Sequence, residues 1–183
     1  MKFKRLIVVL GLVMFTSGSI FGSEVLKKEI TFNVDHATKY VTGICSDITV
    51  DEVKIQQNGR KYNLKSPFQI SVPVVKITSG DDGRDDHIKE ILGYPEFPLV
   101  QIKVESVQLT EGSYTIKGKL TIHGRTKDFS SNAIVSEVEA NVISIEGKVI
   151  AKFSEYELEN PSLLFMKAKD DIQINYAFQI KVK

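Results

Sequence analysis

Apolar and polar residues alternate along much of the chain, and the most regular example lies at the C-terminus. There the apolar residues occupy every second position: Ile172, Ile174, Tyr176, Phe178, Ile180 and Val182. A period of two places successive side chains on opposite faces of a β-strand, so this segment predicts a strand with one dry and one wet face. Such strands are typical of antiparallel sheets, because parallel strands are usually covered on both faces.

Further strands are predicted along the rest of the chain. Similar alternation, or a strand-like composition, is found at 30–34, 41–50, 68–77, 100–104, 114–122, 129–138 and 143–153. Turn-forming residues such as Asn58-Gly59 and Gly124 separate these segments. About eight amphipathic strands in a flat sheet would leave exposed edges, which closure into a barrel removes. We therefore predict an all-β fold, an antiparallel eight-stranded barrel.

Two of the predicted strands carry a glycine on their apolar face. Gly118 interrupts the segment 114–122, and Gly147 interrupts the segment 143–153. A glycine inside a strand often marks a sharp bend or a close approach of another backbone segment. A tightly coiled barrel requires such features, so both glycines agree with closure.

Two short helices are expected in the connections between strands. Residues 84–92 have apolar side chains at helical spacing and follow acidic residues, which favour the N-terminus of a helix. The pair Asn160-Pro161 predicts a cap and a first turn for a helical segment at 162–166. Both helices would serve as lids or connectors.

The first 23 residues have the pattern of a secretory signal peptide. A basic start precedes an apolar run at 6–15 and small residues at 16–23. The apolar run of about 10 residues falls short of the roughly 20 that a membrane-spanning helix needs, so stable membrane insertion is not expected. We expect a periplasmic or secreted protein that loses residues 1–23, with cleavage after Ser19 as an alternative, and folds as one domain over 24–183.

Charge and cysteine content narrow the possible partners and the source of stability. Without residues 1–23 the chain has 21 basic and 23 acidic residues, a net charge of −2. This balance gives no electrostatic footprint for nucleic acid, so no nucleic-acid partner is expected. Cys45 is the single cysteine, which excludes an intramolecular disulfide, and its position in a predicted strand indicates a buried thiol.

Signatures of catalysis and metal binding are absent from the sequence. It contains no nucleophile elbow, phosphate loop or dinucleotide fingerprint. The acidic run at 81–86 does not fit a calcium loop and is better explained as a solvated turn that begins a helix. His36, His87 and His123 lie far apart and lack a second ligand at zinc spacing. We expect no enzyme activity, no cofactor and no metal site.

Four short stretches share one known pattern. Residues 120–127 read Leu-Thr-Ile-His-Gly-Arg-Thr-Lys, residues 32–36 read Phe-Asn-Val-Asp-His, residues 84–88 read Arg-Asp-Asp-His-Ile, and Phe97-Pro98 opens the next strand. In type and order these stretches resemble the signatures of the YceI-like family, secreted lipocalin-like barrels. The resemblance extends through the last strand and covers nearly all of 24–183.

The resemblance implies a lipocalin-like barrel that binds a polyisoprenoid, a quinone-like lipid or a fatty amide outside the cytoplasm. On this basis the ligand's chain would contact ten apolar residues: Phe32, Val34, Val100, Ile102, Ile116, Leu120, Ile122, Ile174, Tyr176 and Phe178. Its polar head group would meet five residues of the matched motifs: His36, Arg84, Asp85, His87 and His123. An arginine or a protonated histidine can hydrogen-bond a phosphate or carboxylate. Alternatively, an Asp–Arg or Asp–His pair in these motifs pins a loop.

The apolar pattern is equally compatible with a hollow barrel and a packed one. A hollow barrel would carry or sequester a lipid. An enzyme acting on such a lipid would require His36, His87 and His123 to converge at the pocket. A packed barrel would serve as a surface interaction or stress-response protein and would have no cavity. A homodimer is compatible with each of these functions.

Overall fold

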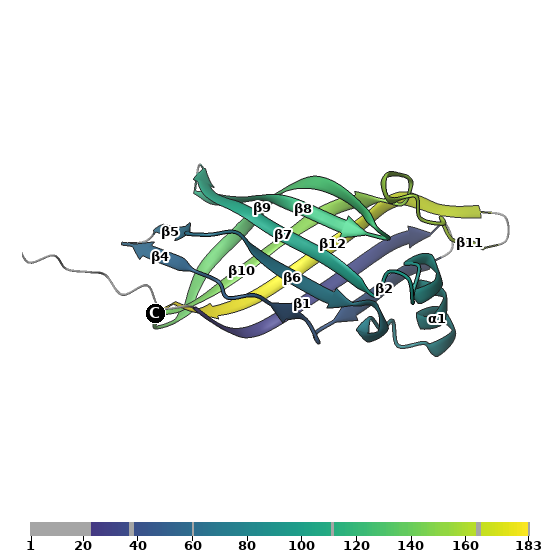
Figure 1. Ribbon diagram of the computed structural model, residues 1–183, viewed down its shortest axis with the longest axis horizontal. Helices are drawn as coiled ribbons and strands as arrows, with labels where there is room; N and C mark the ends of the chain where they lie inside the picture. The colour runs from purple at the N-terminus through teal and green to yellow at the C-terminus, as the bar shows by residue number, and fades with distance from the viewer. Residues whose placement is uncertain (1–22, 37–38, 60, 111, 164–165, 183) are drawn as a thin grey trace, which may run out of the picture.

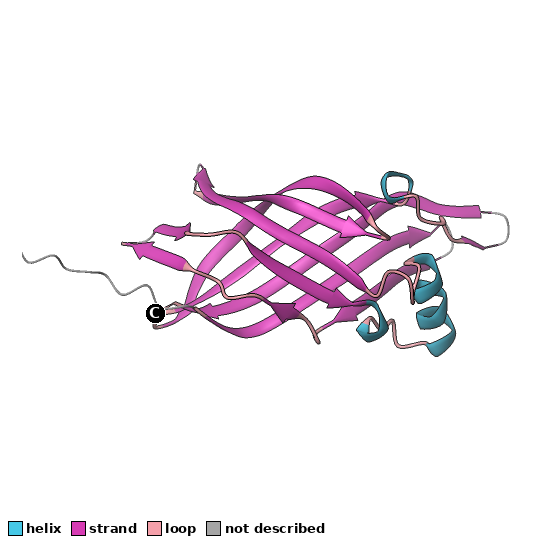
Figure 2. Cartoon of the chain, in the orientation of Figure 1, coloured by secondary structure: helices cyan, strands magenta, loops and turns pink. Residues whose placement is uncertain are grey.

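The computed structural model describes residues 23–36, 39–59, 61–110, 112–163 and 166–182, so the predicted signal peptide lies outside the described residues except for Ser23. Most of the described residues form one antiparallel sheet that curls around a long axis (Figure 1, Figure 2). In the order of hydrogen-bonded neighbours, the strands are β2 (Lys39–Cys45), β1 (Glu24–His36), β12 (Met166–Lys181), β10 (Val142–Lys152), β9 (Arg125–Glu139), β8 (Ser113–Ile122), β7 (Leu99–Thr110), β6 (Phe68–Pro73) and β3 (Thr49–Val50). The predicted all-β barrel is confirmed.

Three short strands lie outside this order. The strands β4 (Ile55–Asn58) and β5 (Lys61–Leu64) form a separate hairpin at one end of the barrel (Figure 1). The strand β11 (Ser162–Leu163) pairs with the beginning of β12 at the opposite end. The predicted strand at 41–50 is divided into β2 and β3, and the one at 68–77 ends at Pro73, after which the chain forms the 3-10 helix η1 (Val74–Lys76).

The two edges of the curled sheet meet beyond β6. The Ile44 amide on β2 donates to the Thr78 carbonyl at 2.8 Å, and the Thr78 amide donates to the Ile44 carbonyl at 3.0 Å. A second bridge joins Ser23 to Val53, where the Ser23 amide donates to the Val53 carbonyl at 2.9 Å. Within the part of the chain that the structure describes, isolated bridges rather than a continuous ladder therefore close the barrel.

The helix α1 (Asp82–Ile91) covers the end of the barrel opposite the β4–β5 hairpin (Figure 1). Its N-cap is Asp81, whose carboxylate accepts a hydrogen bond from the Arg84 amide at 2.8 Å. A side-chain acceptor at this position satisfies one of the free amides of the first turn. The helix predicted from the sequence is thus confirmed, and it begins two residues earlier than expected.

The helical segment predicted at 162–166 is wrong. Ser162 and Leu163 instead form β11, antiparallel to Lys167 and Met166 of β12. The Ala168 amide donates to the Pro161 carbonyl at 2.9 Å, and the Asn160 side-chain amide donates to the Ala168 carbonyl at 3.1 Å. These contacts with β12 hold the segment extended, so tertiary pairing overrides the local preference of Asn-Pro for a helix start.

The interior of the barrel is largely apolar. One cluster of buried residues includes Ile48, Val53, Ile143 and Phe178, and a second includes Leu120, Ile122, Phe153 and Tyr156. Cys45 belongs to the first cluster and is 3% exposed, which confirms the predicted buried thiol. Burial raises the pKa of this thiol, so its neutral form is favoured.

Candidate functional site

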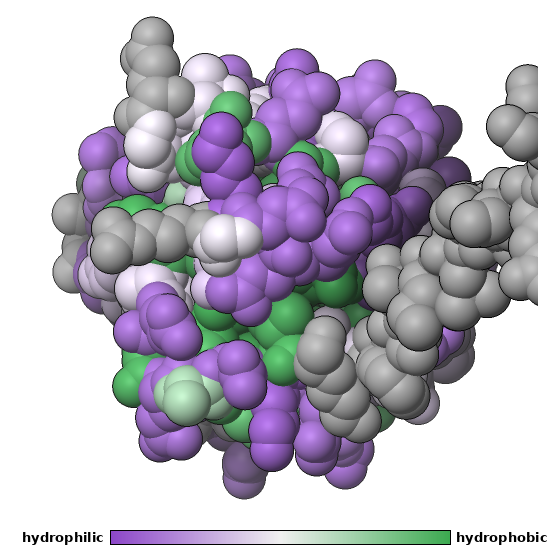
Figure 3. All heavy atoms as spheres, turned by 90° about the vertical axis from the view of Figure 1, so that its left-hand side faces the viewer, coloured by the Kyte–Doolittle hydropathy of each residue, from purple (hydrophilic) through white to green (hydrophobic). Residues whose placement is uncertain are grey.

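A cavity of about 570 Å³ occupies the barrel interior. Its walls are the inward-facing residues of the long strands, from Val25 and Val135 near the β4–β5 hairpin to His36 and Ile122 near α1. Figure 3 looks onto the β4–β5 end, where apolar residues are visible in the middle of a hydrophilic surface. The barrel is therefore hollow, and the packed barrel considered from the sequence is contradicted by this cavity.

All ten residues that the sequence predicted for the ligand's chain line the cavity: Phe32, Val34, Val100, Ile102, Ile116, Leu120, Ile122, Ile174, Tyr176 and Phe178. That they contact a ligand stays a prediction. The lining also includes Phe68, Ile70 and Val72 of β6, which alternate in the sequence and could have been chosen by the same reasoning. The helix α1 adds Ile88 and Ile91, and its C-cap residue Leu92 adds a third apolar side chain; their helical spacing was the available signal.

Three glycines make room for three aromatic side chains at the barrel wall. Gly43, Gly147 and Gly118 are the register partners of Phe32, Tyr176 and Phe129, respectively. A Cβ atom at Gly43 would overlap with the ring of Phe32, and one at Gly147 would overlap with the ring and hydroxyl of Tyr176. Because glycine has no side chain, each aromatic ring can lie close to the strand backbone at that position.

Tyr176 has the most constrained of these rings. Its side chain crosses β10 at Gly147 and places the hydroxyl 2.8 Å from the Ser131 hydroxyl on β9. Ser131 Oγ donates to the Lys148 carbonyl at 2.8 Å, and since a serine has one hydroxyl proton, Tyr176 must be the donor to Ser131. Burial raises the pKa of Tyr176, so its neutral form is favoured. The ring is thus held against the wall by a defined contact.

Polar residues line the cavity mainly at the α1 end, which we call the polar mouth: His36, Lys39, Asp81, Arg84, His87 and Ser162. His36 is 7% exposed, and its Nε2 lies 2.8 Å from the Met166 carbonyl oxygen. Since a carbonyl only accepts, Nε2 carries the proton in this contact. The polar mouth combines histidine, lysine and arginine side chains with a largely apolar interior.

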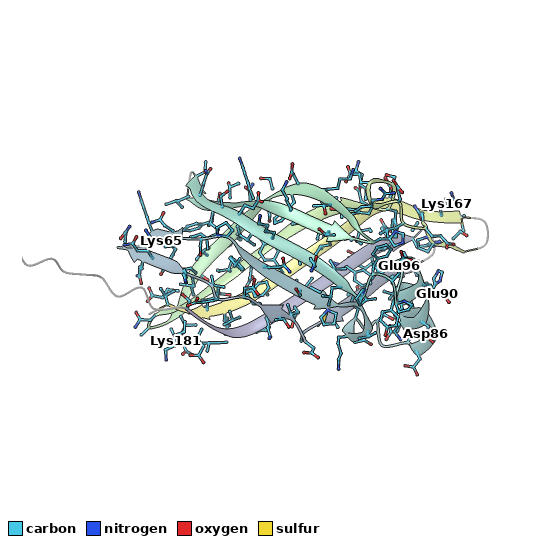
Figure 4. All side chains as sticks on the ribbon, in the orientation of Figure 1. Lys65, Asp86, Glu90, Glu96, Lys167 and Lys181 are labelled. Atoms are coloured by element: carbon cyan, nitrogen blue, oxygen red, sulfur yellow. The ribbon has the colours of Figure 1, made fainter. Side chains whose placement is uncertain are left out.

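Charged side chains of both signs lie on the outer surface of the α1 end, where Figure 4 shows Lys167 as well as Asp86 and Glu90. Asp86 and Glu90 point outward from α1, whereas Lys65 and Lys181 lie at the opposite end of the barrel (Figure 4). On α1 the His87 ring is 3.4 Å from Glu90, and Lys89 donates to Asp86 at 2.8 Å. These exposed contacts stabilise the helix surface rather than the cavity.

Two of the five predicted head-group residues do not line the cavity. The Asp85 carboxylate accepts hydrogen bonds from the Thr78 hydroxyl at 2.7 Å, the Ser79 amide at 2.6 Å and the Ser79 hydroxyl at 2.5 Å. The bonds from Ser79 and Thr78 lower the pKa of Asp85. Because Thr78 also bridges to β2 at the seam, Asp85 fastens α1 to the closure of the barrel. Hydroxyl and amide groups of Thr78 and Ser79 thus hold Asp85, and an Asp–Arg pair is also present at this turn, since Arg84 lies 4.0 Å from the Asp81 carboxylate.

The second is His123, which lies in the turn between β8 and β9 with φ of 49°. Its ring packs edge-on against Phe97, with ring centroids 4.8 Å apart. The structure therefore brings His36, Arg84 and His87 to the polar mouth and leaves His123 in a packing role. The enzyme hypothesis required all three histidines at the pocket, and only two of them line it.

A family model described as the YceI-like domain matches residues 25–180, almost the whole described barrel. The chain belongs to the YceI-like family. A search among curated proteins finds no match. The family assignment confirms the resemblance carried by the four short motifs of this YceI-like chain.

Solved structures with the same fold include three that are related to this YceI-like chain only distantly in sequence. BcnA of Burkholderia cenocepacia superposes with a TM-score of 0.70 at 14% identity, over 83% of this chain and 95% of that one. A polyisoprenoid-binding domain from Saccharophagus degradans, implicated in plant cell wall breakdown, gives 0.65 at 12% identity over 90% and 100%. The YceI protein of Campylobacter jejuni gives 0.57 at 16% identity over 77% and 84%.

Among the residues that the structure describes, no helix has both the length and the apolar character needed to cross a membrane. The same residues contain no group of three or more histidine, cysteine, aspartate or glutamate side chains placed to hold a metal ion.

Proposed function

We propose that this YceI-like protein is exported to the periplasm or secreted, and that it carries or sequesters a long-chain amphiphile in its barrel. The observation that carries the proposal is the continuous apolar cavity of about 570 Å³ between the two ends of the barrel. The structural relative from Saccharophagus degradans, described as a polyisoprenoid-binding domain, supports the choice of an isoprenoid, quinone-like lipid or fatty amide as the ligand.

The apolar interior can supply the affinity without any reaction. Each buried methylene contributes about 0.8 kcal/mol, so a chain of about 15 methylenes would contribute about 12 kcal/mol before the costs of ordering. No step of bond making or breaking is needed for the function we propose. The packing role of His123, outside the cavity lining, supports binding rather than catalysis by the three histidines together.

The ligand's polar head would lie at the polar mouth. Arg84 and His87 on the lining can donate charge-assisted hydrogen bonds to a phosphate or carboxylate. The opposite end of the cavity is lined by Val25, Val107 and Val135, which suit the end of an apolar chain. We therefore place the head near α1 and the tail toward the β4–β5 hairpin.

Native mass spectrometry tests the proposal directly. The protein is expressed from the full 183-residue chain, purified without detergent, and its co-purified material is extracted with solvent and identified. We expect a bound amphiphile, or uptake of an added prenyl phosphate or fatty amide by protein cleared of lipid. The variant Ile102→Trp, which fills the lumen, should fold but lose this uptake. Wild-type protein that is isolated empty and takes up neither probe would refute the proposal.

Fractionation tests the export. The 183-residue chain is expressed in a two-membrane bacterium, and the mass of the protein is measured in each fraction. We expect a shortened protein in the periplasm or medium, with its new N-terminus between residues 20 and 24. Intact protein confined to the cytoplasm would contradict export and leave lipid binding untouched.

A further inference from the structure

The β4–β5 hairpin projects beyond the ends of the long strands and forms a sheet of its own (Figure 1). A hydrogen bond of 3.1 Å from the Tyr62 amide to the Tyr114 hydroxyl connects it to the barrel wall. Tyr62 and Leu64 of β5 line the cavity. Lys61 and Lys65 occupy the alternating positions and are exposed. Because side chains alternate across a strand, one face of this segment covers the cavity and the other presents lysines to solvent.

The hairpin carries positive charge and no negative charge. In the sequence, residues 53–80 contain five lysine or arginine residues and no aspartate or glutamate. Four of the five belong to the hairpin and its flanks: Lys54, Arg60, Lys61 and Lys65. Among the ion pairs between described residues, none involves Lys61 or Lys65. The charges of these two lysines are therefore available to a partner.

The rim of the barrel around the hairpin combines carboxylates with exposed apolar side chains. The described carboxylates lie on the strand ends and in the segment before β4: Glu24, Asp51, Glu52, Glu137 and Glu139. Three large apolar side chains are exposed at the strand ends: Leu26 (50%), Leu109 (41%) and Val138 (48%). Figure 3 looks onto this end and shows apolar residues between hydrophilic ones. The rim thus carries mixed character, and the projecting hairpin adds lysines that a flat partner would meet first.

Exposed aliphatic side chains beside lysines match the surface of a bilayer, where apolar groups lie just below charged head groups. We propose that the β4–β5 end of the barrel docks on an anionic lipid surface, with Lys61 and Lys65 against the head groups. Without residues 1–23 the chain has 21 basic and 23 acidic residues, so its net charge does not attract it to such a surface. The attraction comes from the local charge of the hairpin. This inference goes beyond the proposed function, since docking does not require an occupied cavity.

Cosedimentation with lipid vesicles tests the docking. Protein expressed from the full 183-residue chain is mixed with phosphatidylcholine vesicles, either alone or with about one third phosphatidylglycerol. We expect binding to the anionic vesicles and at least tenfold weaker binding to the neutral ones. Raising the salt from about 0.01 M to about 0.15 M shortens the Debye length from about 30 Å to about 8 Å, so binding to the anionic vesicles should fall at least tenfold.

Two pairs of lysine substitutions locate the charge that matters. Each basic residue near an anionic surface strengthens binding about fivefold, so Lys61→Gln combined with Lys65→Gln should weaken binding about 25-fold. Lys152→Gln combined with Lys167→Gln is the matched control, because both lysines are exposed and lie toward the α1 end. The control should change binding by less than about twofold. Both variants keep residues 1–23 unchanged, so any contribution of that segment cancels in the comparison, and an unchanged Tm shows that each is folded.

A polarity-sensitive fluorophore on a new cysteine shows which end touches the vesicle. Cys45 is 3% exposed, so labelling selects the new thiol of Asn58→Cys on the hairpin or of Glu96→Cys at the α1 end. We expect an emission shift with anionic vesicles at position 58 and none at position 96.

Four results would overturn the inference: wild-type protein that ignores anionic vesicles at low salt, equal binding to neutral vesicles, equal losses in the two lysine pairs, or a shift at position 96 alone. None of them affects lipid binding in the cavity. Conversely, protein that docks on vesicles but is isolated empty and takes up no amphiphile would reject only the proposed function.

Discussion

Replacing Gly118 with alanine should destabilise the barrel strongly, because β8 approaches β7 closely at this residue. Gly118 is paired with Val104 of β7, next to a register shift between Val104 and Ser106. A Cβ atom at this position would overlap with the Lys103 carbonyl oxygen and lie 3.0 Å from the carbonyl carbon. These are backbone atoms of a paired strand, so they cannot move aside as a side chain can.

The size of the effect follows from the two adjustments available to the structure. Overpacking a close contact costs about 1 to 3 kcal/mol. Separating the strands to relieve it also weakens neighbouring hydrogen bonds, at about 1 kcal/mol each. We expect a loss of about 3 kcal/mol, which for a domain of this size lowers the Tm by roughly 6 to 12 °C.

Thermal and urea unfolding followed by circular dichroism measure this loss. Gly83→Ala is the matched control, since its nearest neighbour is the Asp81 carboxylate oxygen at 3.7 Å and alanine favours a helix over glycine by up to about 1 kcal/mol. The same chemical change should therefore be neutral or stabilising in α1. A Gly118→Ala protein with a Tm within 2 °C of the wild type would refute the close approach of β7 and β8 as a constraint on this fold.

Three further substitutions test other parts of the molecule. Asp85→Asn should loosen α1 and speed its cleavage in limited proteolysis several-fold, whereas the control Asp86→Asn should not. Because hydrogen bonds lower the pKa of Asp85, the contact between α1 and the seam in the wild type should weaken only as the pH falls through that lowered pKa. Burial raises the pKa of Tyr156 to about 12, so the free energy of unfolding should fall between pH 10 and 12 by about 2 kcal/mol, and Tyr156→Phe should remove this dependence. Ile143→Ala, at a side chain only 1% exposed, should cost about 3 kcal/mol in urea unfolding.

A specific result would contradict each of these three predictions. Equal cleavage rates for the two aspartate variants would show that Asp85 does not fasten α1. An alkaline stability profile unchanged in Tyr156→Phe would assign the loss to other groups. Ile143→Ala costing less than 1 kcal/mol would mean that the barrel wall relaxes around the deleted atoms.

The sequence by itself determined the long strands of the barrel, because an alternation of apolar and polar residues is a local property that does not depend on distant contacts. The alternation from Ile172 to Val182 predicted one dry face, and the ten residues chosen from such patterns all line the interior. Gly118 could also be recognised from the sequence, because a glycine on the apolar face of a strand often marks a close approach of another backbone segment. The helix after Asp81 also followed from local capping and helical spacing.

Only the tertiary structure decided that the barrel is hollow. The sequence shows Gly147 and Tyr176 as separate residues, 29 positions apart in the printed chain, and gives no sign that one lies over the other across two strands. The sequence also gives no sign that Asp85 binds Ser79, next to the seam, instead of facing the cavity. Nor does it show that β12 holds the segment after Pro161 extended. These features depend on strand register and closure, which join distant residues, and a local pattern carries no information about such pairings.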